Sequence, residues 1–192
     1  MIAKFGFDDG LAIAETEIPD GYEMVDGELV EMPPMSEESN WIGGQLFAVI
    51  NEYCRKHNLG RVYPQDTPFR GFPGDRISVR KPDASFVRRE RLSDRLSKRD
   101  LTIAPDLAAE ILSPNDAAVE VNKKIEQYLA AGVRLVWIVD PDLRIVYVHR
   151  PNGPNTVVRA PDELSGEDVL PGFRCSLDSF IPPVDQTPPS AE

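Results

Sequence analysis

The sequence has few of the residues that form disulfides and zinc sites. Its 192 residues include two cysteines and two histidines. Cys54 and Cys175 are isolated from each other and match no metal-binding or redox spacing. We therefore expect reduced thiols in a cytoplasmic protein, with Cys54 in the core of a helix. His57 and His149 offer little for a histidine-rich zinc site or a Ser-His-Asp triad.

Long apolar runs are also missing. No apolar stretch approaches the roughly 20 residues that a membrane span needs. The first 17 residues contain early acids and no continuous apolar segment, so we expect no signal peptide. The composition is 41% hydrophobic and 28% charged, which is typical of a soluble globular protein. The length suits one domain, which we expect over residues 1–181, followed by a disordered Pro-rich tail over residues 182–192.

The sequence also lacks an excess of basic residues over acidic ones. The formal net charge is −11 at pH 7, whereas a protein that binds phosphates through a basic face is typically rich in lysine and arginine. The basic residues that are present cluster between Arg70 and Arg99. The cluster is either a local positive patch near Asp83 or a solvated charged loop, and the sequence leaves both interpretations open.

The first elements can be read from turn and capping residues. An Asp-Gly pair inside residues 22–32 predicts a β-hairpin with a type I′ turn. A helix is then expected to begin at Ser36 or Ser39, whose hydroxyl can cap it. The helix should run to about His57, and Gly60 is expected to stop it.

The rest of the chain alternates between apolar strands and one further helix. Strands are expected over residues 61–67, 77–79, 84–87, 107–112, 133–139 and 144–150, and a second helix over residues 116–131. This order predicts an α/β fold, bordering on α+β, with a mixed central sheet and a helix on each side.

The strand expected over residues 107–112 carries one acid among apolar residues. Because side chains alternate along a strand, Glu110 shares its face with Ala108 and Leu112. A carboxylate on an apolar face is costly unless something pairs with it. A glutamate facing solvent on an edge strand is the alternative. The lack of other polar residues on this face favours a carboxylate kept for a cation.

A second acid, Asp83, opens another apolar run. It follows Pro82 and precedes the apolar residues 84–87. A Pro-Asp pair is common in turns, so Asp83 is either a turn residue or a second ligand at the start of a strand. The residue by itself does not distinguish these two roles.

Helical geometry separates the two lysines of the second helix. The apolar stripe of that helix is formed by Ala118, Val121, Ile125, Tyr128 and Leu129. Lys123 lies nearly opposite the stripe and should point to water. Lys124 lies at the margin of the stripe, so its long side chain can return the ammonium toward the sheet. The alternative for Lys124 is an ordinary surface lysine whose stem covers apolar residues.

Two acids and a lysine match the needs of metal-assisted phosphodiester hydrolysis. Carboxylate oxygens hold Mg²⁺ without fully dehydrating it. The ion activates water and stabilises charge on the phosphate, and an ammonium can orient that water or offset the developing charge. We therefore predict that Asp83, Glu110 and Lys124 converge on one metal-dependent hydrolytic site.

Several segments together resemble a known family, the Uma-type family, which is classed among the restriction endonucleases and is similar to the PD-(D/E)xK nuclease superfamily. The resemblance covers about residues 20–180. It rests on the YEMVDGELVEM stretch, the Pro-Asp step at Asp83, the EILSPND stretch from Glu110, the KIEQYLAAGV stretch from Lys124 and the VWIVDP stretch from Val136.

The resemblance implies a restriction-endonuclease-like fold, nucleic acid (DNA above all) as the substrate, and a Mg²⁺ site in which Mn²⁺ can substitute. Asp83, Glu110 and the backbone carbonyl of Ile111 would be the metal ligands. The superfamily pattern places a lysine two residues after the acid, where this chain has Leu112. In this family the lysine lies on the following helix, which matches Lys124. Glu31 would be an additional acid.

Two other functions remain open. A histidine that is often present early in the first helix of the family is absent here, where Ser39 or Asn40 stands. Together with the net charge of −11, this allows a nuclease-fold domain that no longer cuts and serves as a binding or regulatory module. The third alternative is a structural homodimer or larger homo-oligomer, formed through the apolar strand over residues 133–139 and the strand after it.

Overall fold

A six-stranded sheet is the centre of the computed structural model, which describes residues 18–70, 72, 78–96, 98, 100–114 and 116–183. The sheet order is β3-β4-β5-β6-β7-β8. These strands are β3 (Gly60–Pro64), β4 (Ala84–Arg88), β5 (Leu107–Ile111), β6 (Leu135–Asp140), β7 (Ile145–His149) and β8 (Thr156–Arg159). Only β5 and β6 are parallel neighbours among these six strands; the other four pairs are antiparallel, which confirms the mixed sheet.

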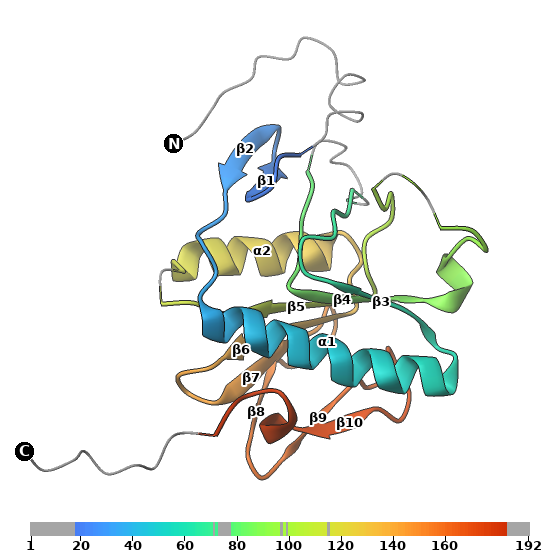
Figure 1. Cartoon of the computed structure of the whole chain (residues 1–192), viewed down its shortest axis with the longest axis vertical. Helices are drawn as coiled ribbons and strands as arrows, with labels where there is room; N and C mark the ends of the chain where they lie inside the picture. Colours follow the sequence, from blue (N-terminus) through green and yellow to red (C-terminus); the bar gives the residue numbers. More distant parts are fainter. Residues whose placement is uncertain are drawn as a thin grey trace, which may run out of the picture.

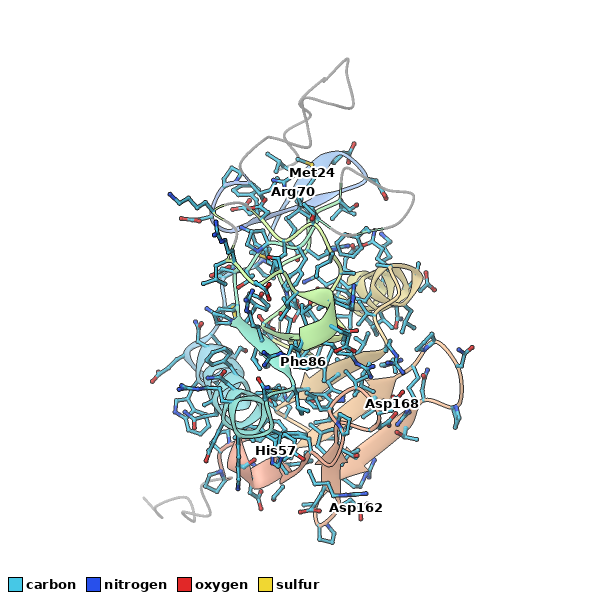
Figure 2. All side chains as sticks on the ribbon, turned by 90° about the vertical axis from the view of Figure 1, so that its right-hand side faces the viewer. Met24, His57, Arg70, Phe86, Asp162 and Asp168 are labelled. Atoms are coloured by element: carbon cyan, nitrogen blue, oxygen red, sulfur yellow. The ribbon has the colours of Figure 1, made fainter. Side chains whose placement is uncertain are left out.

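Two long helices cover opposite faces of this sheet. Helix α1 (Glu37–His57) packs on one face, and helix α2 (Ala118–Ala130) packs on the other; Figure 2 shows both nearly end-on. Helix α2 is the crossover between β5 and β6, because two parallel neighbouring strands need a connection that returns the chain to the same edge. The architecture is the predicted restriction-endonuclease-like α/β fold.

A hairpin and a group of C-terminal elements lie at the two ends of the molecule (Figure 1). The predicted N-terminal hairpin is confirmed as β1 (Tyr22–Val25) and β2 (Glu28–Glu31), and both of its turn residues have positive φ, 49° at Asp26 and 80° at Gly27. The remaining elements are η2 (Arg89–Arg91), β9 (Glu163–Ser165), β10 (Arg174–Ser176) and η3 (Leu177–Ser179).

The hairpin is anchored by backbone pairing with a distant segment. Met24 N–H donates to the Val79 carbonyl at 3.1 Å, and Val79 N–H donates to the Met24 carbonyl at 2.8 Å. Met24 and Val79 are both buried. This pairing places β1 beside the chain that leads into β4, on the same side of the sheet as α2 (Figure 1).

The core forms two layers, one on each face of the sheet. The layer under α1 contains Ile42, Leu46, Ile50 and Cys54 of the helix together with Leu107, Ala109 and Ile111 of β5. The layer under α2 contains Ala108, Ile125, Tyr128, Val136 and Ile138. The predicted alternation along β5 and the core position of Cys54 are confirmed. Burial raises the pKa of the Cys54 thiol to about 12, so this thiol is a structural residue.

The strands that suggested a dimer face lie inside the sheet. β6 pairs with β5 and β7, and β7 pairs with β6 and β8. The apolar side chains of β6 are buried in the two core layers, so they pack within this chain.

Within the described ranges, no helix is long and apolar enough to cross a membrane. Most of the predicted Pro-rich tail, from residue 184 onward, lies outside those ranges.

The first helix ends differently from the prediction. Ser36 caps its beginning, since its Oγ accepts the Ser39 N–H at 3.0 Å. The C-cap is Asn58, whose φ of 54° is left-handed, a conformation that asparagine adopts more readily than most residues. Gly60 is therefore not the residue that stops the helix. It is the first residue of β3.

We expect Gly60→Ala to lower the free energy of unfolding by about 3 kcal/mol, because a Cβ there overpacks the core. That Cβ would lie 2.7 Å from Cε2 of Phe86 and closer still to the carbonyl oxygen of Val87. Urea denaturation measures the effect. The matched control is Gly44→Ala on the exposed face of α1, where the new Cβ would have no neighbouring atom within 4 Å. Because alanine favours the helix more than glycine does, this variant should raise the free energy of unfolding by up to about 1 kcal/mol. Equal stability of the two variants would contradict the packing argument.

Candidate active site

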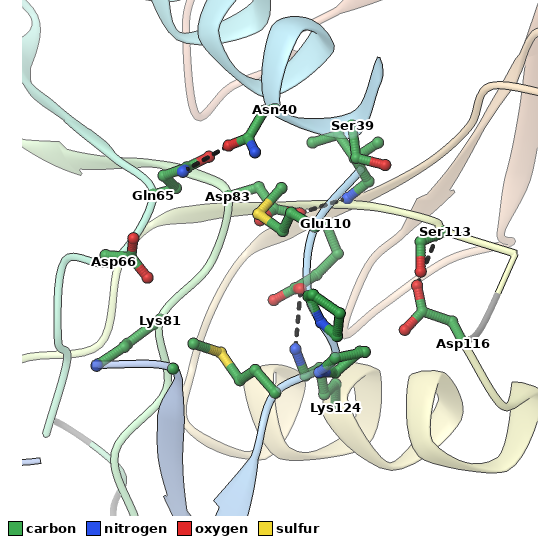
Figure 3. Close-up of a pocket in the computed structure, with 16 residues that line it drawn as sticks. Ser39, Asn40, Gln65, Asp66, Lys81, Asp83, Glu110, Ser113, Asp116 and Lys124 are labelled. Carbon is green, nitrogen blue, oxygen red and sulfur yellow. Dashed lines mark hydrogen bonds and ion pairs between the residues drawn. The ribbon is translucent and has the colours of Figure 1, made fainter. Parts of the chain in front are cut away.

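The topology brings the three predicted side chains to one end of the sheet. Asp83 precedes β4, and Glu110 lies near the end of β5. The two strands are antiparallel neighbours, with Ala84 opposite Ala109, so the two acids meet across the pair. Lys124 lies on α2, which follows β5 directly. Figure 3 shows the three side chains around one cavity.

The two lysines of α2 have the orientations that helical geometry predicted. Lys124 Nζ lies 3.1 Å from Glu110 Oε2, and its side chain is 25% exposed. Lys123 Nζ instead pairs with Glu120 at 2.8 Å, and its side chain is 59% exposed. The ammonium that faces the sheet is therefore that of Lys124.

Glu110 is a buried, fully engaged carboxylate. It is 8% exposed on an inner strand, which excludes the solvent-facing edge glutamate considered above. Its Oε1 accepts the Tyr128 hydroxyl at 2.6 Å, while Oε2 faces Lys124. Burial raises the pKa of Glu110 above its ordinary value, although Lys124 and Tyr128 act in the opposite direction.

Asp83 is held by the backbone of β5. Its Oδ2 accepts the Ile111 N–H at 2.7 Å, and its own N–H donates to the Ala109 carbonyl at 3.0 Å. Burial and then the nearby Glu110 raise the pKa of Asp83 to about 8, although the Ile111 N–H and Lys124 oppose this shift. The site thus holds two buried carboxylates that disfavour each other's charge.

This donor set fits a hard divalent cation. Across the part of the chain that the structure describes, no group of three or more His, Cys, Asp or Glu side chains is arranged to hold a metal. Mg²⁺ is commonly bound by one or two carboxylates, with water and substrate oxygens completing its coordination. Ile111 lines the cavity beside the acids. Because its N–H points to Asp83, its carbonyl lies on the same side of β5.

The acids and Lys124 line a cavity of about 290 Å³ (Figure 3). The cavity is also lined by Asn40 and Gln65, which are hydrogen-bonded to each other at 2.8 Å and lie on the side of Asp83. Ser39, the other residue in the region where a histidine was expected, also lines the cavity and is 2% exposed. The cavity therefore offers amide and hydroxyl groups, but no imidazole among its lining residues.

Glu23 is the residue that sequence reasoning missed. It is 1% exposed on β1, its Oε2 lies 2.6 Å from Arg80 Nη1, and its Oε1 accepts the Lys81 N–H at 2.8 Å. The same Oε2 lies 3.5 Å from Lys124 Nζ. Burial raises the pKa of Glu23, but Lys124 and Arg80 outweigh it and hold the pKa below its ordinary value. An acid inside an apolar strand, the signal that singled out Glu110, was present here too.

Glu31, the predicted additional acid, takes a different position. It is exposed at the end of β2, opposite Tyr22. It lines a groove of about 470 Å³ to which Glu110 and Lys124 also contribute, but it does not line the cavity that contains Asp83. Glu23, another acid of the hairpin, lies within ion-pair distance of Lys124.

Comparisons with known proteins support the fold and the family. A model of the Uma2 family, described as "Putative restriction endonuclease", matches residues 12–178. The crystal structure of a "putative nuclease belonging to DUF820" from Anabaena variabilis superposes with a TM-score of 0.74 at 24% identity. The match covers 87% of this chain and 93% of that chain, and at this identity it shows the fold alone. No curated protein matches the sequence.

The raised pKa of Asp83 predicts a pH-dependent stability in the metal-free protein. The carboxyl stabilises the fold fully below its unfolded pKa of 3.8, and this contribution is lost as the pH rises through the folded value of about 8. With a chelator present, the free energy of unfolding of Asp83→Asn should equal that of the wild type near pH 4 and exceed it by a few kcal/mol near pH 8. Urea denaturation between these two pH values measures the difference. A difference that does not change with pH would contradict the prediction.

Removing the Glu23 carboxylate should be strongly destabilising. Glu23→Ala leaves the buried Arg80 guanidinium and the Lys124 ammonium with fewer partners, so we expect a loss of about 3 to 5 kcal/mol in the free energy of unfolding. Glu126→Ala, an exposed acid on α2, is the control and should change stability by less than about 0.5 kcal/mol. A loss under about 1 kcal/mol for Glu23→Ala would show that the network contributes little.

Proposed function

Because the chain belongs to the Uma2 family of restriction-endonuclease-like nucleases, we propose that it is a Mg²⁺-dependent endonuclease that hydrolyses phosphodiester bonds in nucleic acid, with DNA as the substrate and Mn²⁺ as a substitute ion. The observation that carries this proposal is the convergence of Asp83, Glu110 and Lys124 on one cavity. The predicted cytoplasmic location is consistent with two buried free thiols.

Asp83, Glu110 and the Ile111 carbonyl would hold the ion. Mg²⁺, when bound, supplies positive charge at the scissile phosphate and lowers the pKa of water. The Ile111 N–H fixes one oxygen of Asp83 and leaves the other available, while the Tyr128 hydroxyl and Lys124 fix the orientation of Glu110. These contacts position both ligands before any substrate arrives.

Lys124 is suited to act on the attacking water or the phosphate. Burial lowers its pKa, but Glu110 and Glu23 raise it further, so the net pKa lies above the ordinary value and the ammonium stays charged. A charged ammonium cannot act as a general base. It can donate hydrogen bonds that orient water, and it can offset the negative charge that develops on the phosphate in the transition state.

The second candidate is a nuclease-fold module that binds without cutting. The absence of histidine from the cavity wall and the net charge of −11 favour it. Calorimetric titration with Mg²⁺ or Mn²⁺ separates the candidates. Binding that is lost in Glu110→Ala supports the endonuclease, whereas no binding to the wild type supports the module. Homodimer formation stays a prediction.

Cleavage assays test the proposed endonuclease. Purified protein should nick supercoiled plasmid or single-stranded DNA in Mg²⁺ or Mn²⁺, and the Asp83→Ala/Glu110→Ala variant should not. Lys124→Ala should lower kcat by about 10²- to 10³-fold, because one donor to the developing charge is lost. Lys123→Ala is its matched control and should keep wild-type activity. Nicking by the wild type at the level of the double variant would refute the proposal.

A further inference from the structure

A second hollow adjoins the active site along the edge strand β3. This hollow, which we call the β3 groove, has a volume of about 580 Å³ and lies between β3 with its following turn and the described residues 91–96, 98 and 100–103. Among the described residues that line it, four are basic, Arg61, Arg91, Arg95 and Lys98, and one is acidic, Asp100.

The β3 groove is positively charged in a chain whose net charge is −11. Asp100 is neutralised by Arg70, whose Nε lies 2.5 Å from its Oδ2. Arg91 Nη1 pairs with the buried Asp106 at 2.9 Å. After these pairs are set aside, Arg61, Arg95 and Lys98 remain as the cations that face the groove. This electrostatic profile attracts a polyanion.

Two of the four cations, Arg61 and Arg91, are held by backbone carbonyls. Arg61 Nη2 donates to the Ser93 carbonyl at 3.1 Å, and Arg91 Nη2 donates to the Ala104 carbonyl at 2.9 Å. These bonds hold the segment that carries η2 against β3. Arg95 and Lys98 are exposed, so their charged groups can reach a ligand without first breaking a buried contact.

The groove also offers apolar and aromatic surface. Tyr63 lines it and packs edge-on against Phe69, with ring centroids 5.8 Å apart. Leu96 lines it and is 74% exposed. Cations beside an aromatic ring and an exposed apolar side chain suit a nucleotide chain better than a free phosphate, because the chain brings both phosphates and bases or sugars.

The groove and the active-site cavity lie on two sides of one turn. Gln65 and Asp66 line the cavity, whereas Tyr63 and Thr67, their immediate neighbours in sequence, line the groove. Thr67 Oγ1 donates to the Pro64 carbonyl at 2.8 Å, which stabilises the turn. β4 leads from Asp83 in the active site to Arg89, the first residue of η2. At about 3.3 Å per residue this separation is about 20 Å, which equals the length of about six base-pair steps of duplex DNA.

We propose that the β3 groove binds the phosphodiester backbone of the same nucleic acid that enters the active site. The part of the basic cluster that lines the groove, Arg91, Arg95 and Lys98, is then a binding surface at the far end of β4 from Asp83, whereas Lys81 of the same cluster lines the active-site cavity. This inference rests on the proposed function for the identity of the ligand. The contact itself is electrostatic and needs no catalysis.

The test is a charge reversal in the groove, Arg95→Glu/Lys98→Glu, compared with the same charge change elsewhere. Arg159→Glu/Arg174→Glu is the matched control, because both arginines are exposed on β8 and β10, away from the groove lining. Fluorescence anisotropy follows binding of a labelled duplex of about 30 base pairs, with Ca²⁺ in place of Mg²⁺, at about 50 to 200 mM KCl.

The groove variant should bind at least about tenfold more weakly than the control at the lowest salt. Its slope of log affinity against log salt should be shallower by about two, as expected when two phosphate contacts are lost. Equal affinity of the two variants would overturn the proposal, and so would a wild-type protein that does not bind the duplex. Circular dichroism and urea denaturation confirm that both variants are folded.

A short substrate separates failure of the groove from failure of the active site. Bis(p-nitrophenyl) phosphate is too small to reach the groove, so its hydrolysis in Mg²⁺ should be the same in the wild type and in Arg95→Glu/Lys98→Glu. Loss of that hydrolysis in the groove variant alone would assign Arg95 and Lys98 to the active site and overturn the proposal. A wild type that binds duplex but hydrolyses neither substrate refutes the endonuclease and leaves the groove intact.

Discussion

The rest of the structure depends on the pairing of charges that are buried at one end of the sheet. Glu110 lies on an inner strand, where an isolated carboxylate would be prohibitively costly. Its partner Lys124 can reach it only if α2 crosses the face of the sheet directly after β5. Glu23, which also faces Lys124, requires the hairpin to dock on the same side. The positions of a helix and a hairpin are thus tied to one cluster of charges.

Charge pairing in this cluster is incomplete at Asp83. The other two carboxylates each lie within ion-pair distance of a cation, whereas Asp83 accepts one backbone N–H, and burial beside Glu110 raises its pKa. A site that folds with like charges close together stores an unfavourable interaction that a divalent ion would relieve. Such strongly perturbed groups in a cavity are typical of functional sites, because stability alone would favour apolar residues there.

The acidic composition and the proposed nucleic-acid substrate are reconciled by where the charges lie. Arg80 and Lys124 are occupied in the buried network, and Lys124 also lines the active-site cavity. The cations of the β3 groove are set apart from this network by the turn that contains Gln65. An otherwise acidic surface would then limit non-specific contact, and phosphates would be attracted mainly to the groove and to the ion that the two carboxylates would hold under the proposed function.

Local patterns in the sequence predicted much of the fold and the site. Turn chemistry predicted the hairpin, the period of two along β5 predicted which face Glu110 occupies, and the helical period distinguished Lys124 from Lys123. These properties follow from neighbours within a few residues, and backbone geometry alone places them. They are the part of the structure that the sequence by itself determined.

The remaining features required the tertiary structure, because they depend on residues that are distant in the chain. Gly60 was assigned to a helix end, but its lack of a side chain is needed for contact with Phe86. Glu23 was missed because its partner Arg80 lies 57 residues away and meets it only when the hairpin docks. Which acid reaches Lys124, and at which end of β4 the basic residues lie, was decided by packing between elements, since no local pattern records the partner of a buried charge.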